Sequence, residues 1–203
     1  MGEVEGGIPY DPDKHHRRSV RLRGYDYALA GAYFVTNCTH ARECLLGTVL
    51  DGRMILSKYG SAVQDCWNDL PRHYGHVVLD EMVIMPNHVH GIIILTPPDV
   101  ATSSVGAGLP VLAGPGKPAP NTESALAQAK RHGLPEIVRA LKTHSSRRIN
   151  ELRLTHSADV WQRNYHDRII RNDRQLQAIR GYIRSNADHW AEDPESPNGA
   201  VRA

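Results

Sequence analysis

Two histidines, His88 and His90, are separated by one valine in a stretch that is otherwise apolar as far as Leu95. Side chains alternate faces along a β-strand, so both imidazoles are predicted to lie on one face and Val89 on the other. Two neutral imidazoles side by side can bind a divalent metal ion. Taken alone, the pair is more typical of a strand edge where both histidines face solvent, so other residues are needed to distinguish the two interpretations.

A second polar group is predicted on the last helix, between about residues 173 and 190. Tyr182 and Asn186 are four residues apart and therefore lie on the same flank, beside an apolar stripe that contains Leu176. An amide oxygen can complete the coordination of a hard metal ion, and a tyrosine hydroxyl beside such an ion can attack phosphorus. Together with the histidine pair, these residues indicate a metal site with a nucleophile next to it.

The positive charge is unevenly distributed, although the net charge is only +2. From Lys130 to Trp190 there are thirteen Lys or Arg residues against six Asp or Glu residues, and a second basic cluster lies near the N-terminus. Arginine suits bidentate contact with phosphate, and two such clusters favour a polyanionic substrate over an ordinary solvated surface. The candidate contact residues are Arg17, Arg18, Arg21, Arg23, Arg139, Lys142, Arg147 and Arg148.

The bulk properties limit the class of protein. A chain of 203 residues can form one well-buried domain, and its composition is ordinary for a globular protein. No apolar stretch approaches the roughly 18–20 residues that span a bilayer, and the N-terminus has no apolar signal region. The three cysteines form no paired motif, which favours reduced thiols and a cytoplasmic location.

The order of the predicted elements defines the fold class. It is strand, hairpin, helix, two strands, helix, strand and helix, which matches a ferredoxin-like split βαβ sandwich of the α+β class. Such a sandwich has an antiparallel sheet with helices on one face, and the closing helix that carries the tyrosine is an addition. The predicted elements span residues 32–39, 45–56 (turning at Asp51-Gly52), 57–71 (capped by Ser57 and broken at Pro71), 77–85, 88–96, 135–152, 159–171 and 173–190 (capped by Asn172 or Asp173).

The domain organisation predicted from composition is simple. Residues 1–23 form a basic N-terminal arm, and residues 24–190 form a single domain. The Pro/Gly-rich stretch 97–133 lacks periodicity and is predicted to be a flexible insertion within that domain. Residues 191–203 are predicted to be a frayed, disordered tail.

Several segments of the chain together resemble the REP-associated tyrosine transposases, a branch of the single-tyrosine HUH (insertion-sequence 200-like) transposases. The resemblance covers most of residues 17–190 and omits the 97–133 insertion. Histidine-hydrophobic-histidine alone is a weak signal, but it is specific in this order and with the downstream Tyr-x-x-x-Asn. The segments that carry the resemblance are 17–27, 32–39, 42–44, 85–91, 161–171 and 182–186.

The resemblance implies a mechanism and a substrate. It implies that His88 and His90 are metal ligands, that Asn186 completes the site, and that Tyr182 is the nucleophile. Such enzymes use Mg²⁺ or Mn²⁺, act on single-stranded or hairpin DNA, and form a 5′-phosphotyrosine intermediate. They work as a monomer in the REP-associated branch or as a homodimer in other branches. Many relatives outside the REP-associated branch carry glutamine where this chain has Asn186.

The sequence leaves alternatives open for the nucleophile, for other polar residues and for the function. Tyr165 is the rival nucleophile, but it has no partner at metal-ligand spacing, so packing against the core or at a strand edge is expected. His166 and Asp167 are expected to shape a substrate channel or to be structural, and His144 is expected to be a surface residue. The alternative functions are a domesticated hairpin-DNA-binding protein without catalysis and a metal-dependent phosphoesterase that uses water.

Overall fold

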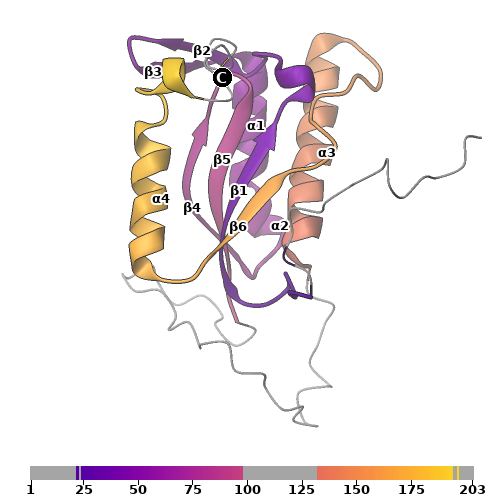
Figure 1. Cartoon of the computed structure of the whole chain (residues 1–203). Helices are drawn as coiled ribbons and strands as arrows, with labels where there is room; N and C mark the ends of the chain where they lie inside the picture. The colour runs from indigo at the N-terminus through magenta and orange to yellow at the C-terminus, as the bar shows by residue number, and fades with distance from the viewer. Residues whose placement is uncertain (1–21, 23, 98–131, 194–195, 197–203) are drawn as a thin grey trace, which may run out of the picture.

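The computed structural model describes residues 22, 24–97, 132–193 and 196 (Figure 1). Nearly all of the predicted N-terminal arm and of the predicted 97–133 insertion lie outside the described residues, as does most of the predicted tail. Within the described residues, the elements follow one another in the predicted order. No helix in this part of the chain is long and apolar enough to cross a membrane.

A four-stranded antiparallel sheet forms the centre of the fold, in the order β4-β5-β1-β6. With one helical segment after the first strand and another before the last, this order is the ferredoxin-like split βαβ sandwich. The predicted α+β fold class is therefore confirmed. The strands are β1 (Gly31–Cys38), β4 (Val77–Ile84), β5 (His88–Leu95) and β6 (His166–Ile170).

A separate hairpin follows β1. Its strands, β2 (Gly47–Leu50) and β3 (Arg53–Leu56), pair with each other and with no other strand of the described residues. The turn lies at Asp51 and Gly52, whose φ values are 49° and 71°. Two consecutive positive φ values are what a tight turn between twisted strands requires, and Asp-Gly is a favoured pair there. The predicted hairpin and its turn are thus confirmed.

Helices cover both faces of the sheet. On one face lie α1 (Lys58–Asn68), α2 (Leu70–His73) and α3 (Leu134–Arg153). The last helix, α4 (Asp173–Ser185), packs on the opposite face. The cluster on the first face includes Tyr33, Val35, Trp67, Ile93, Ile137 and Leu141, and the cluster on the α4 face includes Ala32, Ile92, Ile94, Ile170, Leu176, Ile179 and Ile183.

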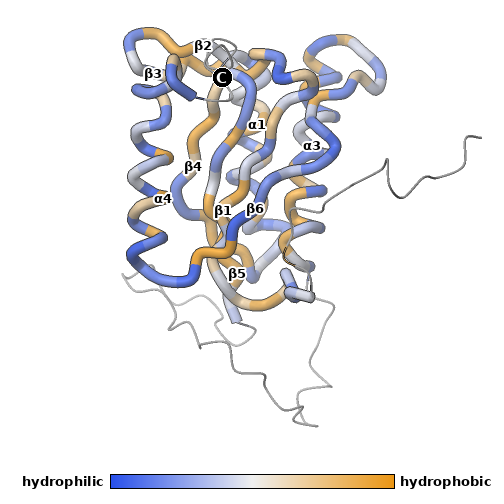
Figure 2. The backbone as a smooth tube through the Cα atoms, viewed as in Figure 1, coloured by the Kyte–Doolittle hydropathy of each residue, from blue (hydrophilic) through white to orange (hydrophobic). Residues whose placement is uncertain are grey.

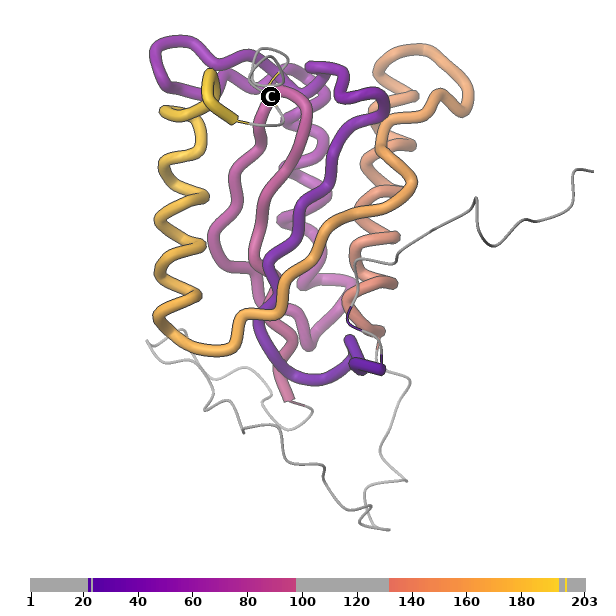
Figure 3. Tube along the Cα trace, viewed as in Figure 1, coloured from indigo at the N-terminus to yellow at the C-terminus, as the bar shows by residue number. Residues whose placement is uncertain are grey.

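The chain reaches the second face by passing around one edge of the sheet. In Figure 3 it descends from α3 along β6 and then turns into α4 on the other side. Figure 2 shows hydrophobic and hydrophilic residues alternating from turn to turn along α4, as expected for a helix with one face on a sheet and one in solvent.

Side-chain caps fix where two of the helices begin. The Ser57 hydroxyl accepts hydrogen bonds from the backbone N–H groups of Tyr59 and Gly60 at the start of α1. The Asn172 side chain accepts from the N–H of Gln175 at the start of α4. Each cap satisfies amide groups that have no partner inside the helix. The Ser57 cap was predicted from the sequence, and Asn172 was one of the two residues predicted to cap α4.

The end of α4 differs from the prediction. The helix ends at Ser185, with Asn186 as its C-cap, and a separate 3-10 helix spans Trp190–Glu192. Serine, asparagine and aspartate are weak helix formers, which accounts for the early end. Within the segment predicted to be a frayed tail from residue 191, Asp193 and Ser196 are buried.

The extended segment predicted at 159–171 is mostly not a strand. Only His166–Ile170 pairs regularly, and Trp161 makes an isolated bridge with Thr39. Between these two parts, the carbonyl oxygens of residues 162–164 accept hydrogen bonds from the Lys142 ammonium on α3. These carbonyls are therefore bonded to a side chain instead of to a neighbouring strand.

Candidate metal and tyrosine site

The two histidines begin strand β5 and face α4. Both are buried, with 0% of His88 and 5% of His90 exposed, and their ring centroids are 4.4 Å apart. In the sheet register His88 lies opposite Cys38 and His90 opposite Thr36. The interpretation as a solvent-facing pair is therefore wrong, because the sheet and α4 enclose both rings.

Each imidazole is oriented by a hydrogen bond at Nδ1. His88 Nδ1 lies 2.9 Å from the Asn87 side-chain oxygen, and His90 Nδ1 lies 2.8 Å from the Thr36 hydroxyl. Contacts of this kind fix the ring orientation and the tautomer of histidines that bind metals. With Nδ1 engaged, Nε2 is the nitrogen with which each ring can coordinate a cation.

His90 stays neutral over the whole physiological range. Burial is the main cause that lowers its pKa, to about 3, and the charge of nearby His88 lowers it further. A neutral imidazole keeps a nitrogen lone pair, which is the form that binds a metal ion.

Tyr182 lies beside the histidine pair. Its hydroxyl is 3.1 Å from His90 Nε2, and its ring contacts the rings of His90 and Phe34. The side chain is 45% exposed, so its oxygen lies at the boundary between the buried histidines and solvent. A substrate can approach this hydroxyl without opening the fold.

Asn186 follows one turn later and is 3% exposed. Its Nδ2 donates to the Asp193 carboxylate over 3.4 Å, which sets the orientation of the amide. Its Oδ1 is buried and has no hydrogen-bond partner among the described residues. A buried carbonyl oxygen without a partner is costly, and a bound cation would satisfy it.

Asp193 is the residue of this group that the sequence did not indicate. Ligand atoms of His88, His90 and Asp193 all lie within 4.8 Å of one another, and all three residues are buried. The 3-10 helix before it returns the chain to the site, where the Trp190 ring lies 6.0 Å from that of His88. The only sequence signal was an acidic residue seven positions after Asn186, which is too common to identify a ligand.

These residues fit a divalent cation. Two imidazole nitrogens and a carboxylate oxygen lie close together, and the buried amide oxygen of Asn186, which has no hydrogen-bond partner among the described residues, offers a further oxygen donor beside Asp193. Imidazole suits transition-metal ions, while amide and carboxylate oxygens suit Mg²⁺ and Mn²⁺. The group as a whole therefore suits Mn²⁺ at least as well as Mg²⁺.

The predicted DNA-binding residues do not gather at this site. Arg17, Arg18, Arg21 and Arg23 lie outside the described residues. The other four belong to α3, on the opposite face of the sheet from α4. There Arg147 pairs with Glu151, Arg148 pairs with Asp65, and Lys142 is bound to backbone carbonyls.

Arg139 is the exception among the basic residues of α3. It is exposed, and it makes no hydrogen bond or ion pair with any residue that the structure describes. With Lys142 and Arg163 it lines a groove of about 930 Å³ between α3 and the segment 157–165. This groove is the place on α3 where the geometry leaves a guanidinium available to an anion.

The rival residues lie apart from the metal group. Tyr165 packs against the core cluster on the α1 and α3 face, as expected for a structural tyrosine. His144 is exposed and stacks on His73 with 6.3 Å between centroids. Neither side chain contacts the His88 and His90 pair.

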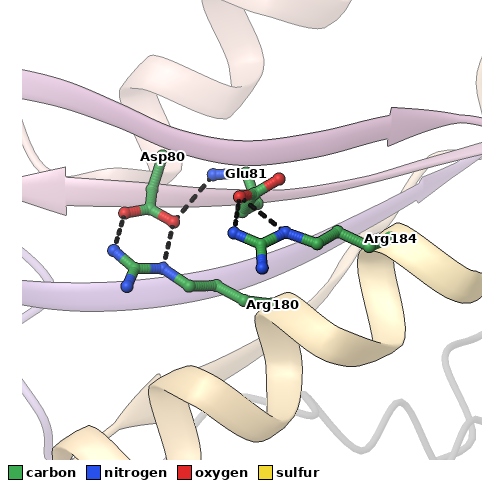
Figure 4. A network of polar contacts seen from close by, with 4 residues as sticks. All are labelled: Asp80, Glu81, Arg180 and Arg184. Atoms are coloured by element: carbon green, nitrogen blue, oxygen red, sulfur yellow. Dashed lines mark hydrogen bonds and ion pairs between the residues drawn. The ribbon is translucent and has the colours of Figure 1, made fainter.

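Two ion pairs anchor the tyrosine helix on the edge strand β4 (Figure 4). Arg180 Nε donates to Asp80 over 2.8 Å, and Arg184 Nε donates to Glu81 over 3.0 Å. The β4–β5 register shifts between Leu79 and Met82, so Asp80 and Glu81 together oppose one residue of β5. This β-bulge brings two successive carboxylates onto the α4 face, where regular alternation would place only one.

The arginines lie two residues before and two residues after Tyr182. Arg180 also holds the pKa of the Asp80 carboxyl below its usual range through its hydrogen bonds. The tyrosine is therefore carried by a helix that is fixed to the sheet on both sides of it. This attachment is made within one chain.

The arrangement can be compared with known proteins. Its fold is similar to that of a solved REP-associated tyrosine transposase bound to a REP hairpin, with a TM-score of 0.50 and 15% sequence identity over 82% of this chain and 72% of that one. The fold predicted by the resemblance is thus confirmed: the chain has the fold of a REP-associated tyrosine transposase.

A closer relative is known by sequence. An uncharacterized protein of Haemophilus influenzae (strain Rd) is 34% identical over 184 residues, which cover 91% of this chain and 95% of the relative. The chain belongs to the same family as this Haemophilus influenzae protein. No protein-family model matches the chain.

Proposed function

We propose that the chain is a metal-dependent tyrosine HUH transposase that cleaves and rejoins single-stranded DNA at hairpin-forming sites. One observation carries the proposal above all others. The Tyr182 hydroxyl lies 3.1 Å from Nε2 of His90, at the mouth of a buried histidine pair. A nucleophile, two metal-binding imidazoles and an amide oxygen that has no hydrogen-bond partner among the described residues suit phosphoryl transfer through a covalent tyrosine intermediate.

In this proposal His88, His90, Asn186 and Asp193 hold a divalent cation, Mg²⁺ or Mn²⁺. When bound, such an ion polarises the scissile phosphate and offsets the negative charge that builds up in the transition state. Thr36 and Asn87 keep the imidazoles in the orientation that coordination needs. The hydrogen bond from Asn186 to Asp193 fixes the orientation of the amide, with Nδ2 and not Oδ1 facing the carboxylate.

Tyr182 supplies the nucleophile. Its phenolic oxygen loses its proton to solvent and forms a bond to phosphorus, while the bond from phosphorus to the 3′ oxygen breaks. The 3′ oxygen takes up a proton and leaves as a free 3′-OH, and the DNA stays attached as a 5′-phosphotyrosine. Because a phenolate is a good leaving group, a later 3′-OH can reverse the step and rejoin DNA without a nucleotide cofactor.

The substrate and the working unit are also proposals. The transposase of similar fold was solved with a REP hairpin, which supports a hairpin-forming substrate here. Because α4 docks on strand β4 of its own chain, a monomer can assemble the whole group, and a homodimer is not needed for it. An enzyme with this substrate would work on DNA in the cytoplasm.

A covalent trapping experiment tests the function. Purified protein is incubated with Mn²⁺ and a 3′-labelled oligonucleotide that carries a hairpin, and a denaturing gel then resolves any protein–DNA adduct. We expect an adduct with the wild-type protein and none with Tyr182→Phe, while Tyr165→Phe serves as a matched tyrosine control and keeps the adduct.

Two results would contradict the proposal. Hairpin binding without any cleavage would favour a domesticated DNA-binding protein. Cleavage that persists in Tyr182→Phe would favour a phosphoesterase in which water is the nucleophile.

A further inference from the structure

The face of the sheet that carries the site is covered unevenly. α4 lies beside the edge strand β4 (Figure 1), to which Arg180 ties it, and its apolar residues bury Ile92 on β5. On β6, at the other edge, His166 and Arg168 are exposed, and Phe34 on the neighbouring strand β1 is only partly buried. A strip of β1 and β6 is therefore accessible on this face.

The strip lies next to the tyrosine and the histidines. Thr36, which is bonded to His90, pairs across the sheet with His166, and Phe34 pairs with Arg168. Residues paired in this way point to the same face of an antiparallel sheet. The Phe34 ring is stacked on His90 at 5.2 Å and lies edge-on to Tyr182 at 6.2 Å. Phe34 thus lies between the proposed nucleophile and the exposed arginine.

The chemistry of the strip suits one kind of ligand. Arg168 makes no ion pair or hydrogen bond with any residue of the described chain, so its guanidinium is available to an anion. The His166 ring can donate an N–H in either neutral tautomer. A partly exposed aromatic ring beside cationic and N–H donors is one way in which proteins bind unpaired nucleotides, with bases stacked and phosphates paired.

We propose that Phe34, His166 and Arg168 bind the single-stranded DNA next to the phosphate that Tyr182 attacks. Phe34 stacks on a base, while Arg168 and His166 contact phosphates on the β6 side. The inference rests on the proposed function, because it takes the Tyr182 hydroxyl as the point where the strand is cut. These substrate contacts lie on the face of the sheet opposite to the face that carries α3 and its basic residues.

Equilibrium binding tests the strip without any chemistry. Fluorescence anisotropy measures the affinity of a labelled single-stranded oligonucleotide for the Tyr182→Phe protein, with Mn²⁺ present. Adding Arg168→Ala should weaken binding about tenfold. It should also lower the slope of log K against log salt by about 0.7, the value for one lost phosphate contact on a single strand.

Arg174→Ala is the matched control. Arg174 is an exposed arginine of α4, two residues before buried Leu176 and so on the solvent side of that helix. We expect this variant to bind the oligonucleotide with the same affinity, and with the same slope of log K against log salt, as the Tyr182→Phe protein into which it is introduced. If Arg168→Ala and Arg174→Ala bind the oligonucleotide equally well, the assignment of Arg168 is overturned.

The stacking contact is tested at Phe34. Phe34→Leu should weaken single-strand binding by about fivefold or more, and Phe34→Tyr should restore most of the affinity, because stacking needs an aromatic ring. Unchanged Mn²⁺ affinity and thermal unfolding would show that Phe34→Leu has not disturbed the adjacent histidine. Equal binding by the Leu and Tyr variants, or a fully paired duplex binding more tightly than the single strand, would overturn the proposal.

The outcomes separate this inference from the proposed function. If Arg168→Ala weakens binding but the wild-type protein forms no adduct, the strip is supported and the transposase function is contradicted. If the wild-type protein forms the adduct but Arg168→Ala does not weaken binding, the transposase function is supported and the strip is contradicted.

Discussion

At the scale of single residues, each side chain of the candidate metal site is oriented by a hydrogen bond to a neighbour. Thr36 and Asn87 bind the histidine Nδ1 atoms, and Asp193 binds the amide nitrogen of Asn186. Asp193 has two roles: it orients the amide of Asn186, and its carboxylate lies close enough to both histidines to bind the same metal ion. The loss of an outer-shell partner typically lowers metal affinity 10- to 100-fold.

Asp193→Asn should therefore weaken Mn²⁺ binding by about tenfold or more. The substitution keeps the size of the side chain but removes its charge, so the fold is preserved. Calorimetric titration of the metal-free protein with Mn²⁺ measures the change. Glu192→Gln, at the exposed neighbouring position, is the control and should bind Mn²⁺ like the wild type. Equal affinities of the two variants would exclude Asp193 as a ligand or as an orienting group.

Gly91 is the residue that lets the tryptophan of α1 lie against the strand of the histidines. A Cβ at this position would come within 2.3 Å of the Trp67 ring, whereas a Cβ at Gly181 on α4 would meet nothing within 4 Å. Gly91→Ala should lower the free energy of unfolding by about 1–3 kcal/mol through overpacking. Gly181→Ala should raise it by about 0.5–1 kcal/mol, because alanine favours the helix. Urea denaturation of both variants checks the opposite signs.

The sequence could predict part of this group and not the rest, for physical reasons. The two-residue spacing of His88 and His90 on a strand, and the four-residue spacing of Tyr182 and Asn186 on a helix, each follow from local geometry. Asp193 joins the group only because the chain turns back after α4, and no local pattern encodes that turn. The buried environment of the histidines likewise depends on where α4 docks.

At the scale of elements, the position of α4 is set by a strand irregularity as well as by its apolar face. The predicted cap at Asn172 or Asp173 and the apolar stripe were enough to predict a helix and its approximate start, and the structure has the cap at Asn172. The bulge at Asp80 and Glu81 was not predictable, because nothing in a strand sequence marks the residue at which its pairing shifts. Yet the bulge supplies both carboxylates that hold the helix.

The Asp80–Arg180 pair should make stability depend on pH in a defined window. Arg180 lowers the pKa of Asp80 in the folded protein, so the stabilisation is fully present above the unfolded pKa of about 3.9 and is lost as the pH falls through the folded pKa. Asp80→Asn should be less stable than the wild type by about 1–2 kcal/mol at pH 7, and the difference should shrink below about pH 4. Chemical denaturation at several pH values measures it, and a difference that stays constant down to pH 3 would contradict the assignment.

At the scale of the whole molecule, the complete group is assembled by one chain whose last helix follows β6 and docks beside β4 at the other edge of the sheet. If α4 acts on its own sheet, two inactive variants should not rescue each other. A mixture of Tyr182→Phe and His88→Ala should form no more covalent adduct with a hairpin oligonucleotide than either variant alone. Adduct formation in the mixture would mean that the tyrosine helix is exchanged between chains, and light scattering of the same samples would then reveal a dimer.

The bulge in β4 has one more consequence, for the way the protein behaves at high concentration. β4 is the outermost strand on its side of the sheet, and an unpaired edge is a template for strands of other molecules. The irregular backbone at Asp80 and Glu81 interrupts that template. The two charged side chains also make it unfavourable for a strand of another molecule to pair with this edge. The feature that holds the tyrosine helix in place therefore also protects the protein from edge-to-edge aggregation.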